Sequence, residues 1–502
     1  MRFVKLNQAR MDRVLWYLGL AVLAVALILT LIAKPGLIEI GNRTLVFTQW
    51  WQGDLMDTGS LEALVREFED KNPGIRIKLD TRPYTEIRDL LGASDRSDPD
   101  GDVTGKSFAS DIIGIDSRWL WELVQQNRLE PLVAYRARTE AETLWTEGPP
   151  TEGPPIADPT TEAPMLVGPE TAGSEAADST TESPTSDLRT EYLQTPALGS
   201  EVPMRLTSGE GEEAAIGDWA RPLVSFMTPL FYNIDMLQAA GFDRPPRNQT
   251  EFEAFAKAVT DTNTGRYGFA LGLGEQESQG VYRDIFSWIW AAGQPMTAGG
   301  VLKIDTPQAT AALRFLQGLN KEGVIAPGSF TKTGQDRLEE FRAGKIGMMI
   351  ASIGDIRALA AAQAHQTAGD LAFGITTIPA PAAYQGKPVF GLTNWCAGIS
   401  RTSKHKNEAW AFIAFLSDRA PQIAASSGAI HGGSSTTDDP LMAKAYDIYE
   451  TGGGLEEFAG FPREVFLETV VWEEVRRLLE ENQTPDYTAA VIEKRVAGGG
   501  MR

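Results

Sequence analysis

The stretch DWARPLVSFMTPLFYNIDMLQAAG, from Asp218 to Gly241, decides how the chain is divided. Its apolar residues between Leu223 and Tyr232 form a β-prone run, and Asn233 offers a capping side chain to a short helix that stops at Gly241. An acidic segment that is poor in large apolar residues precedes the stretch, and a long region of alternating strand and helix patterns follows it. We therefore interpret residues 223–233 as a strand that crosses from one globular body to the next.

Length and charge limit the classes of protein that fit this sequence. A chain of 502 residues is too long for one core, which indicates two or more globular bodies. The net charge of −21 argues against nucleic-acid binding. Residues 138–215 hold 16 acidic and 3 basic residues, so most of the excess negative charge is local. The remainder is a mildly acidic protein whose charge says little about its ligand.

Cysteine and histidine are scarce. Cys396 is the single cysteine, so neither an intrachain disulfide nor a cysteine-rich metal site can form. The three histidines His365, His405 and His431 lack the spacing of metal ligands on one helix. We expect neither a metal ion nor a cofactor.

The N-terminal segment has the pattern of a membrane anchor. Residues 14–33, VLWYLGLAVLAVALILTLIA, contain no charge and are long enough to span a bilayer as a helix. Four basic residues precede them, which predicts a cytoplasmic tail over 1–13 and an extracytoplasmic location for the rest. The alternative is a cleaved signal peptide, although its apolar region would be unusually long and Lys34-Pro35 makes a poor cleavage site.

Strand and helix patterns alternate after residue 43. Strands are expected at 44–48, 75–79 and 110–116, with helices around 61–68 and 84–91 between them. This β-α-β-α-β order is typical of a mainly parallel sheet covered by helices, so the fold class is α/β. Ligands of such sheets bind beyond the carboxyl ends of the strands.

Aromatic and polar residues follow these strand ends. Aromatic rings suit stacking on the apolar faces of sugars, and carboxylates accept hydrogen bonds from sugar hydroxyls. Trp50 and Trp51 are adjacent on a segment expected to be extended, so we expect at most one of them in the core. The ligand-binding candidates in this part of the chain are Trp50, Trp51, Gln52, Asp54, Tyr84 and Asp116.

Residues 138–215 are rich in Pro, Thr, Glu, Ser, Ala and Gly and contain near-repeats such as TEGPP at 146–150 and 151–155. So few large apolar side chains cannot offset the entropy of ordering, which predicts a disordered insertion. A docking tail, a glycosylated stretch and a tolerated surface-loop insertion all fit this composition.

The second half continues the α/β alternation. Helices are expected at 250–259, 282–292, 306–319, 408–417 and 472–479, and strands at 265–271, 344–352 and 373–378. Residues 388–400 are expected to form a strand pair or one long strand with Trp395 midway. Trp288 and Trp290 are two apart on a helix and diverge, so one of them is expected in the core.

The order of these elements resembles a known family, the extracellular solute-binding proteins of ABC importers, and within it the sugar-binding group that includes maltodextrin-type binders. The matching segments are FEDKNPGIRI (68–77), DIIGID (111–116), LFYNID (230–235) with Ala240-Gly241, FRAGKIGMMI (341–350) and KHKNEAWAFI (404–413). They occur in the order of the family and extend from about residue 44 to 480, apart from the acidic insertion.

The resemblance implies a class II periplasmic-binding-protein fold with two lobes, a crossing-strand hinge and a sugar held in the cleft. Lobe 1 would comprise 44–137 and 399–435 and lobe 2 would comprise 234–387, with crossings at 223–233 and 388–398. The C-terminal helices within 436–495 would pack mainly on lobe 2. The protein would act as a monomer that delivers its ligand to ABC permease subunits.

The resemblance also implies ligand positions. They are Trp50 and Trp51 after the first strand, Asp116 after the third, Trp288 or Trp290 in lobe 2, and Trp395 at the second crossing. Where the family often has Gly-Pro-Trp after the Met-Met-Ile strand, this chain has Ser352-Ile-Gly-Asp355. A stacking surface is thereby lost, and a hydrogen-bonding or cation-pairing carboxylate is gained at Asp355, next to Ser352.

Two other classes of function use the same features. A tethered receptor subunit would sense a ligand by the same lobe closure and signal to a membrane sensor. Neighbouring genes would distinguish this role from import: permease and ATPase genes favour import, and a sensor kinase gene favours signalling. A glycoside-acting enzyme needs paired carboxylates across a cleft, which Asp54, Asp116 and Asp355 could supply. The chain has no nucleophile elbow, so a binding protein is favoured over an enzyme.

Overall fold

Two β-sheets organise the part of the chain that the structure describes. The structure is a computed structural model, and the residues it describes are 43–51, 56, 59–92, 110–136, 205–207, 213–215, 218–275, 277, 279–298, 300–363, 371–432, 437–458, 461 and 464–498. The expected anchor at 14–33 and residues 138–204 of the acidic insertion lie outside these residues. Within them, no helix is long and apolar enough to cross a membrane.

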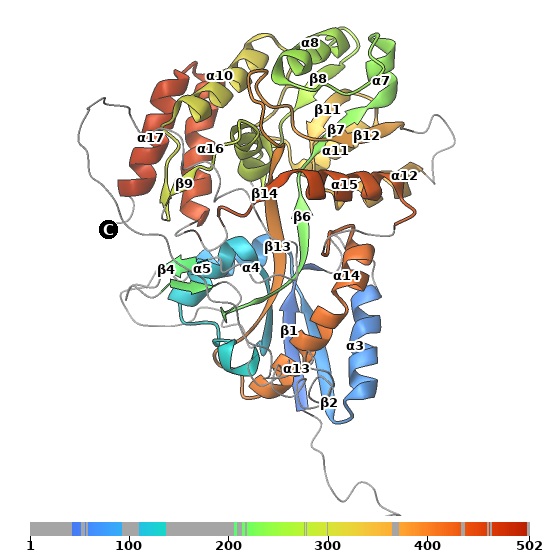
Figure 1. The fold of residues 1–502 in the computed structure, drawn as a ribbon, viewed down its shortest axis with the longest axis vertical. Coiled ribbons are helices and arrows are strands. Elements are labelled where there is room, and N and C mark those ends of the chain that lie inside the picture. Colours follow the sequence, from blue (N-terminus) through green and yellow to red (C-terminus); the bar gives the residue numbers. More distant parts are fainter. Residues whose placement is uncertain are drawn as a thin grey trace, which may run out of the picture.

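Lobe 1 is built on a mixed sheet with the order β14-β13-β3-β1-β2, and β6 pairs with β13 (Figure 1). Strands β1, β2 and β3 run parallel, whereas β13 runs antiparallel to β3 and β6. Strand β3 is buried along its whole length, as expected for an inner strand. The strands are β1 (Arg43–Gln49), β2 (Ile75–Thr81), β3 (Ile112–Asp116), β6 (Arg221–Met227), β13 (Val389–Ile399) and β14 (Gly453–Leu455).

The helices of lobe 1 follow from local apolar spacing. In α3, buried Leu61, Leu64, Val65 and Phe68 recur at helical intervals and form one apolar face. The lobe 1 helices are α3 (Ser60–Lys71), α4 (Tyr84–Gly92), the 3-10 turn η2 (Ser117–Trp119), α5 (Leu120–Gln125), α13 (Lys406–Asp418) and α14 (Ala420–Ser427).

Lobe 2 has a four-stranded sheet with the order β12-β7-β11-β8. Its strands are β7 (Leu230–Asn233), β8 (Tyr267–Ala270), β11 (Ile346–Ile350) and β12 (Phe373–Thr376). Side-chain caps start several of its helices: Asn233 accepts from Met236 N–H before α7, and Thr333 forms a capping box before α11.

The helices of lobe 2 include the C-terminal ones, as Figure 1 shows. They are α7 (Ile234–Ala239), α8 (Gln249–Val259), the π-helical turn η4 (Tyr282–Phe286), α9 (Ser287–Trp290), α10 (Pro307–Lys321), α11 (Gly334–Arg342), α12 (Asp355–Gln363), α15 (Pro440–Thr451), α16 (Glu464–Glu480) and α17 (Pro485–Gly498). Two short antiparallel pairs complete the described elements: β9 (Thr297–Ala298) with β10 (Val301–Leu302), and β4 (Arg205–Thr207) with β5 (Glu213–Ala215). The last pair lies inside the insertion, so the expectation that all of 138–215 lacks regular structure is wrong for these residues.

The two crossings lie side by side. The stretch 223–233 forms two strands, β6 in the lobe 1 sheet and β7 in the lobe 2 sheet, and the chain changes sheet at Thr228-Pro229. Strand β13 is one long strand rather than a pair, and it pairs with β6 from Leu392↔Met227 to Ala397↔Arg221. The register shifts between Trp395 and Cys396, which marks a bulge beside the crossing.

The buried apolar side chains do not divide along the boundary between the lobes. One cluster runs from the lobe 1 sheet through β6 and β13 to one face of the lobe 2 sheet, where it includes Phe231, Met349 and Phe373. A second cluster fills the other face of lobe 2 against α8, α9, α10, α16 and α17. The two lobes therefore share one apolar core at the crossing strands. The contact between α16 of lobe 2 and helices α4 and α5 of lobe 1 lies elsewhere.

Candidate functional site

A small cavity lies between the two lobes beside the crossing strands. Its volume is about 30 Å³, enough for one or two water molecules. Both lobes and both crossings contribute to its wall, which is lined by Arg118, Thr228, Gln279, Tyr282, Arg283, Trp290, Gly391, Leu392, Thr393, Leu455, Glu457 and Phe458. Because the lobes meet around it, a larger guest enters only if they part.

Arg118 is the lobe 1 side chain that lines this cavity. Its guanidinium makes two bonds to Asp116, with Nε 2.9 Å from Oδ1 and Nη2 2.6 Å from Oδ2. Tyr84 joins them, since its hydroxyl donates to Asp116 Oδ2 at 3.0 Å and accepts from Arg118 Nη2 at 2.8 Å. The candidates Tyr84 and Asp116 therefore hold Arg118 in place, and Arg118 presents the charge to the cleft.

Arg118 was not among the residues predicted to bind ligand. Asp116 ends β3, and its carboxylate accepts the backbone N–H of Arg118 as the cap of η2. This short turn aims the guanidinium at lobe 2, where its carbon lies 4.6 Å from the ring centre of Tyr282. The signal was present in the sequence, because Arg118 follows the strand end by two residues.

The structure brings the candidate tryptophans Trp50, Trp51 and Trp395 together. The rings of Trp51 and Trp395 are stacked, with centroids 5.2 Å apart and an interplanar angle of 1°. Trp50 lies edge-on to both at 6.2 Å and contacts Tyr84 at 5.6 Å. The three rings are buried, with exposures of 3%, 0% and 3% in the order Trp50, Trp51 and Trp395, and Trp119 and Phe226 pack against Trp50 and Trp395 at 4.7 Å.

The expectation that at most one of Trp50 and Trp51 is in the core is wrong. It assumed an extended segment, but β1 ends at Gln49 and the chain turns at Trp50. Both indoles can then lie on the same side of the sheet. The neighbouring candidates Gln52 and Asp54 lie outside the described residues.

Trp288 and Trp290 both belong to the buried apolar cluster of lobe 2, with exposures of 0% and 4%, but they contact different partners. Trp288 is fully buried against Phe252 and Phe315, with ring centroids 5.0 and 5.2 Å away, and belongs to the core. Trp290 lines the cavity, and its Nε1–H donates to Glu457 Oε2 at 2.5 Å. Trp290 is therefore the tryptophan of lobe 2 that borders the cleft.

Ser352 and Asp355 close a turn at the end of β11. The Asp355 carboxylate accepts the Ser352 N–H at 3.0 Å, and the Ser352 hydroxyl accepts the Gly354 N–H at 3.2 Å. Burial raises the pKa of Asp355, and the positive Arg283 and Arg337 oppose that rise. Neither residue lines the interlobe cavity, so the structure places them behind its wall.

A buried ionic network supports that wall in lobe 2. Asp284, which is fully buried, binds Arg337 at 2.8 Å and Arg283 at 3.1 Å and accepts the Gly272 N–H at 2.9 Å. Arg283 also reaches Glu277 at 3.4 Å. This network fixes the π-helical turn η4, which carries Tyr282 and Arg283 to the cavity.

Four largely buried carboxyl groups of the segment 456–468 lie near the contact between the lobes, and one of them, Glu457, lines the cavity. Glu457 accepts from Met296 N–H at 2.6 Å and Thr297 N–H at 2.8 Å as well as from Trp290. Burial raises the pKa of the Glu456 carboxyl to about 7, and the nearby negative charge of Asp116 adds to this rise. On α16, burial raises the pKa of Glu464 and Glu468 as well.

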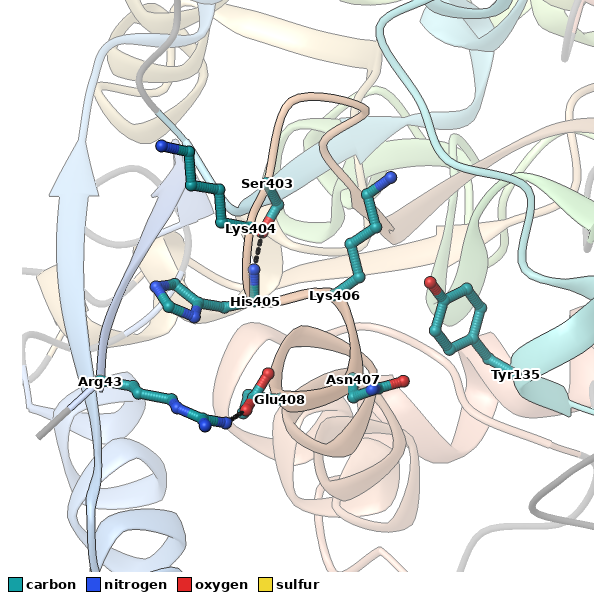
Figure 2. Close-up of a pocket in the computed structure, with 8 residues that line it drawn as sticks. All are labelled: Arg43, Tyr135, Ser403, Lys404, His405, Lys406, Asn407 and Glu408. Atoms are coloured by element: carbon teal, nitrogen blue, oxygen red, sulfur yellow. Dashed lines mark hydrogen bonds and ion pairs between the residues drawn. The ribbon is translucent and has the colours of Figure 1, made fainter. Parts of the chain in front are cut away.

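A larger open hollow lies on lobe 1, away from the cleft (Figure 2). It measures about 630 Å³ and is lined by Arg43, Tyr135, Ser403, Lys404, His405, Lys406, Asn407 and Glu408. Two of its cations are paired, Arg43 with Glu408 and Lys406 with Glu130. Because it faces one lobe only and holds none of the candidate residues, we place the candidate site in the cleft.

No group of three or more His, Cys, Asp or Glu side chains in the described part of the chain is arranged to hold a metal ion. Cys396 is fully buried, and burial raises the pKa of its thiol well above the usual range. The described cleft thus offers carboxylates, guanidiniums, hydroxyls and an indole.

Two lobes, paired crossing strands and a cavity between the lobes define the class as two-lobed binding proteins. The profile of the bacterial extracellular solute-binding proteins matches residues 191–446, about half of the chain. The chain belongs to this family, whose members are binding proteins rather than enzymes and act outside the cytoplasm. This confirms the resemblance inferred from the sequence.

Curated relatives match part of the chain. A binding protein of Brucella abortus (strain 2308) is 28% identical over 196 residues, which is 39% of this chain and 45% of the relative. A protein of Deinococcus radiodurans named as a probable ABC transporter-binding protein is 25% identical over 194 residues, covering 37% and 44% of the two chains. The match thus spans less than half the length of these relatives.

Solved structures share the fold over most of the chain. Maltose-bound MalE3 of T. maritima has a TM-score of 0.61 at 19% identity, covering 90% of this chain and 99% of the other. A chitin oligosaccharide binding protein has a TM-score of 0.62 at 16% identity, covering 91% and 98%. These likenesses establish the two-lobed binding-protein fold.

Proposed function

We propose that this protein binds a sugar or oligosaccharide between its lobes and delivers it to the permease of an ABC importer. The observation that carries the proposal is the interlobe cavity, whose wall combines Arg118 of lobe 1 with Trp290 and Glu457 of lobe 2. An indole face suits a sugar ring, and guanidinium and carboxylate groups suit its hydroxyls. Structural neighbours with maltose or chitin oligosaccharide in their names support this class of ligand.

Parting of the lobes is part of the proposal. A cavity of about 30 Å³ is far below the several hundred Å³ typical of ligand pockets. A sugar therefore enters an open form, and the lobes then close on it about the change of sheet at Thr228-Pro229 and the paired β13. Trp50, Trp51 and Trp395 remain candidates for contact in that open form, because they lie together where the lobe 1 strands meet the second crossing.

A thermal-shift screen of the purified protein against neutral, acidic and amino sugars tests the proposal. A ligand that binds only the native state stabilises it by about 2.7 kcal/mol at a hundredfold excess over Kd, which raises Tm. Calorimetry on a hit should then show that Trp290→Ala weakens affinity about tenfold, or about 1.4 kcal/mol. Trp472→Ala is the matched control, since this lobe 2 indole bonds to Leu273 O away from the cavity.

The screen also separates the alternatives. If no sugar raises Tm, the sugar proposal fails. If a sugar binds but the protein co-purifies with a membrane sensor and not with a permease, the tethered receptor replaces the importer subunit.

We further propose that residues 14–33 anchor the protein in the cytoplasmic membrane and that it acts as a monomer. The support is the uncharged twenty-residue run after a basic N-terminus. Extraction of cell membranes with alkaline carbonate should leave the protein in the pellet, whereas a cleaved signal peptide would release it. Light scattering of a form starting at residue 43 checks the monomer.

A further inference from the structure

Two glutamates at the start of α16 lie where the lobes meet. In Figure 1 this helix of lobe 2 stands opposite α4 and α5 of lobe 1. The Glu464 N–H donates to Glu122 Oε1 of α5 at 3.0 Å, and Arg88 Nη1 of α4 lies 3.5 Å from Glu468 Oε2. Both contacts join one lobe to the other, so opening of the cleft must break them.

The two carboxyl groups are buried next to each other. Glu464 and Glu468 are one helical turn apart, and their exposures are 2% and 6%. Glu464 Oε2 and Glu468 Oε1 are buried, and neither has a hydrogen-bond partner among the described residues. A proton on one carboxyl lets it donate to the other, which satisfies both oxygens.

The surrounding charges do not neutralise the pair. The charged and titratable groups that face it are Arg88 and Tyr84 of α4, Asp116 and Arg118 at the end of β3, Glu122 of α5, and Tyr282 of η4. Arg118 is already bound by Asp116, and Glu122 adds a negative charge. Two arginines thus face four carboxyl groups in a buried contact, which favours a shared proton over two ionised carboxylates.

We propose that closure of the lobes takes up a proton on the Glu464–Glu468 pair, so that acid favours the closed form and rising pH opens it. The proposal concerns regulation of the cleft assigned under the proposed function, and it rests on that function only for the opening of the lobes. In the open form both carboxyl groups are exposed to water, and their pKa values return to those of ordinary glutamate side chains. The closed form then binds more protons, and each proton taken up changes the closing equilibrium up to tenfold per pH unit.

Fluorescence energy transfer across the cleft tests the proposal without any sugar. Dyes attach at Gln125→Cys on α5 and Lys494→Cys on α17, two exposed positions on opposite lobes, while native Cys396 is fully buried. In the full chain we expect the distance between the dyes to increase as pH rises from 5 to 8.5. The double variant Glu464→Gln/Glu468→Gln should stay closed throughout this range.

A matched control uses the same helix. Glu473 and Glu480 of α16 form ion pairs with Arg495 and Arg476 that are at least partly exposed, and Glu473→Gln/Glu480→Gln should behave as the parent protein does. A distance that does not change with pH in the parent, or the same change in the Glu464/Glu468 variant, overturns the proposal.

A second variant keeps the test decisive if the double variant does not fold. Arg88→Gln removes the cation that favours ionised Glu468, so opening should move to lower pH. An unchanged opening pH would contradict the proposal. Because the readout needs no ligand, failure to find a sugar leaves this inference standing, and a constant dye distance leaves sugar binding standing.

Discussion

The guanidinium carbon of Arg118 lies 4.6 Å from the ring centre of Tyr282, so a cation–π contact joins the end of β3 in lobe 1 to η4 in lobe 2. Each partner is fixed within its own lobe, Arg118 by Asp116 and Tyr282 by the rigid turn that the Asp284 network supports. The contact therefore reports the position of one lobe against the other.

Arg118→Ala should lower the free energy of unfolding by about 3–5 kcal/mol, because it leaves the buried Asp116 carboxylate without its cation. Urea unfolding followed by circular dichroism measures the loss. The double variant Asp116→Asn/Arg118→Gln removes both charges and should lose less than the single variant. A loss below about 1 kcal/mol for Arg118→Ala would show that Asp116 is not held as described.

Gly391→Ala should disturb the cavity wall. A Cβ at Gly391 would lie 2.2 Å from Cζ3 of Trp290, so the indole has to move. We expect a destabilisation of about 1–3 kcal/mol and a changed tryptophan emission spectrum. Gly318→Ala in α10 is the control, since a Cβ there meets nothing within 4 Å and should stabilise the helix by about 0.5–1 kcal/mol. Equal effects of the two substitutions would contradict the packing of Trp290.

Trp395→Ala should destabilise the fold by about 3–5 kcal/mol, because it empties the space between Trp51 and Phe226. Trp395→Phe keeps part of that packing and should cost less. If unfolding by urea is unchanged in Trp395→Ala, the stacked pair with Trp51 makes no contribution to stability.

Protonation of Glu456 should make stability fall as pH rises. Its pKa is raised to about 7 in the folded state by burial, whereas an unfolded Glu titrates near 4.3. Between these values the folded protein binds more protons, so its free energy of unfolding decreases from about pH 4.5 to pH 7. Melting temperatures across this range measure the slope, and Glu456→Gln should flatten it. If Glu456→Gln leaves this slope unchanged, groups other than Glu456 cause the dependence of stability on pH.

Deletion of residues 138–204 should leave folding and ligand binding intact, because their composition cannot support a core. A short Gly/Ser linker replaces them, and differential scanning calorimetry compares the two proteins. A drop in Tm of more than about 5 °C, which corresponds to more than about 1 kcal/mol, would show that the segment contributes to the fold.

Most elements were predictable because their signals are local. The apolar spacing of α3, the Asn233 cap of α7 and the Thr306 cap of α10 with Pro307 after it are all visible in a window of a few residues. The family motifs then ordered these elements into two lobes. The choice between one strand and two at 388–400 was not local, because it depends on pairing with β3 and β6.

The cleft was only partly predictable. Aromatic residues at strand ends indicated where Trp50, Trp51 and Trp395 gather, but not that they cover one another. The glutamates Glu457, Glu464 and Glu468 gave no signal, because their partners lie more than 100 residues away in the sequence.

The sequence by itself determined the alternation of strands and helices, the position of the first crossing and the family. These features follow from side-chain periodicity, capping residues and the order of family-like segments along one chain. The tertiary structure alone decided that Arg118 faces Tyr282 and that Glu464 and Glu468 are buried against lobe 1. The physical reason is that burial and pairing of a charge depend on which surface docks against it, and local sequence does not specify how two lobes meet.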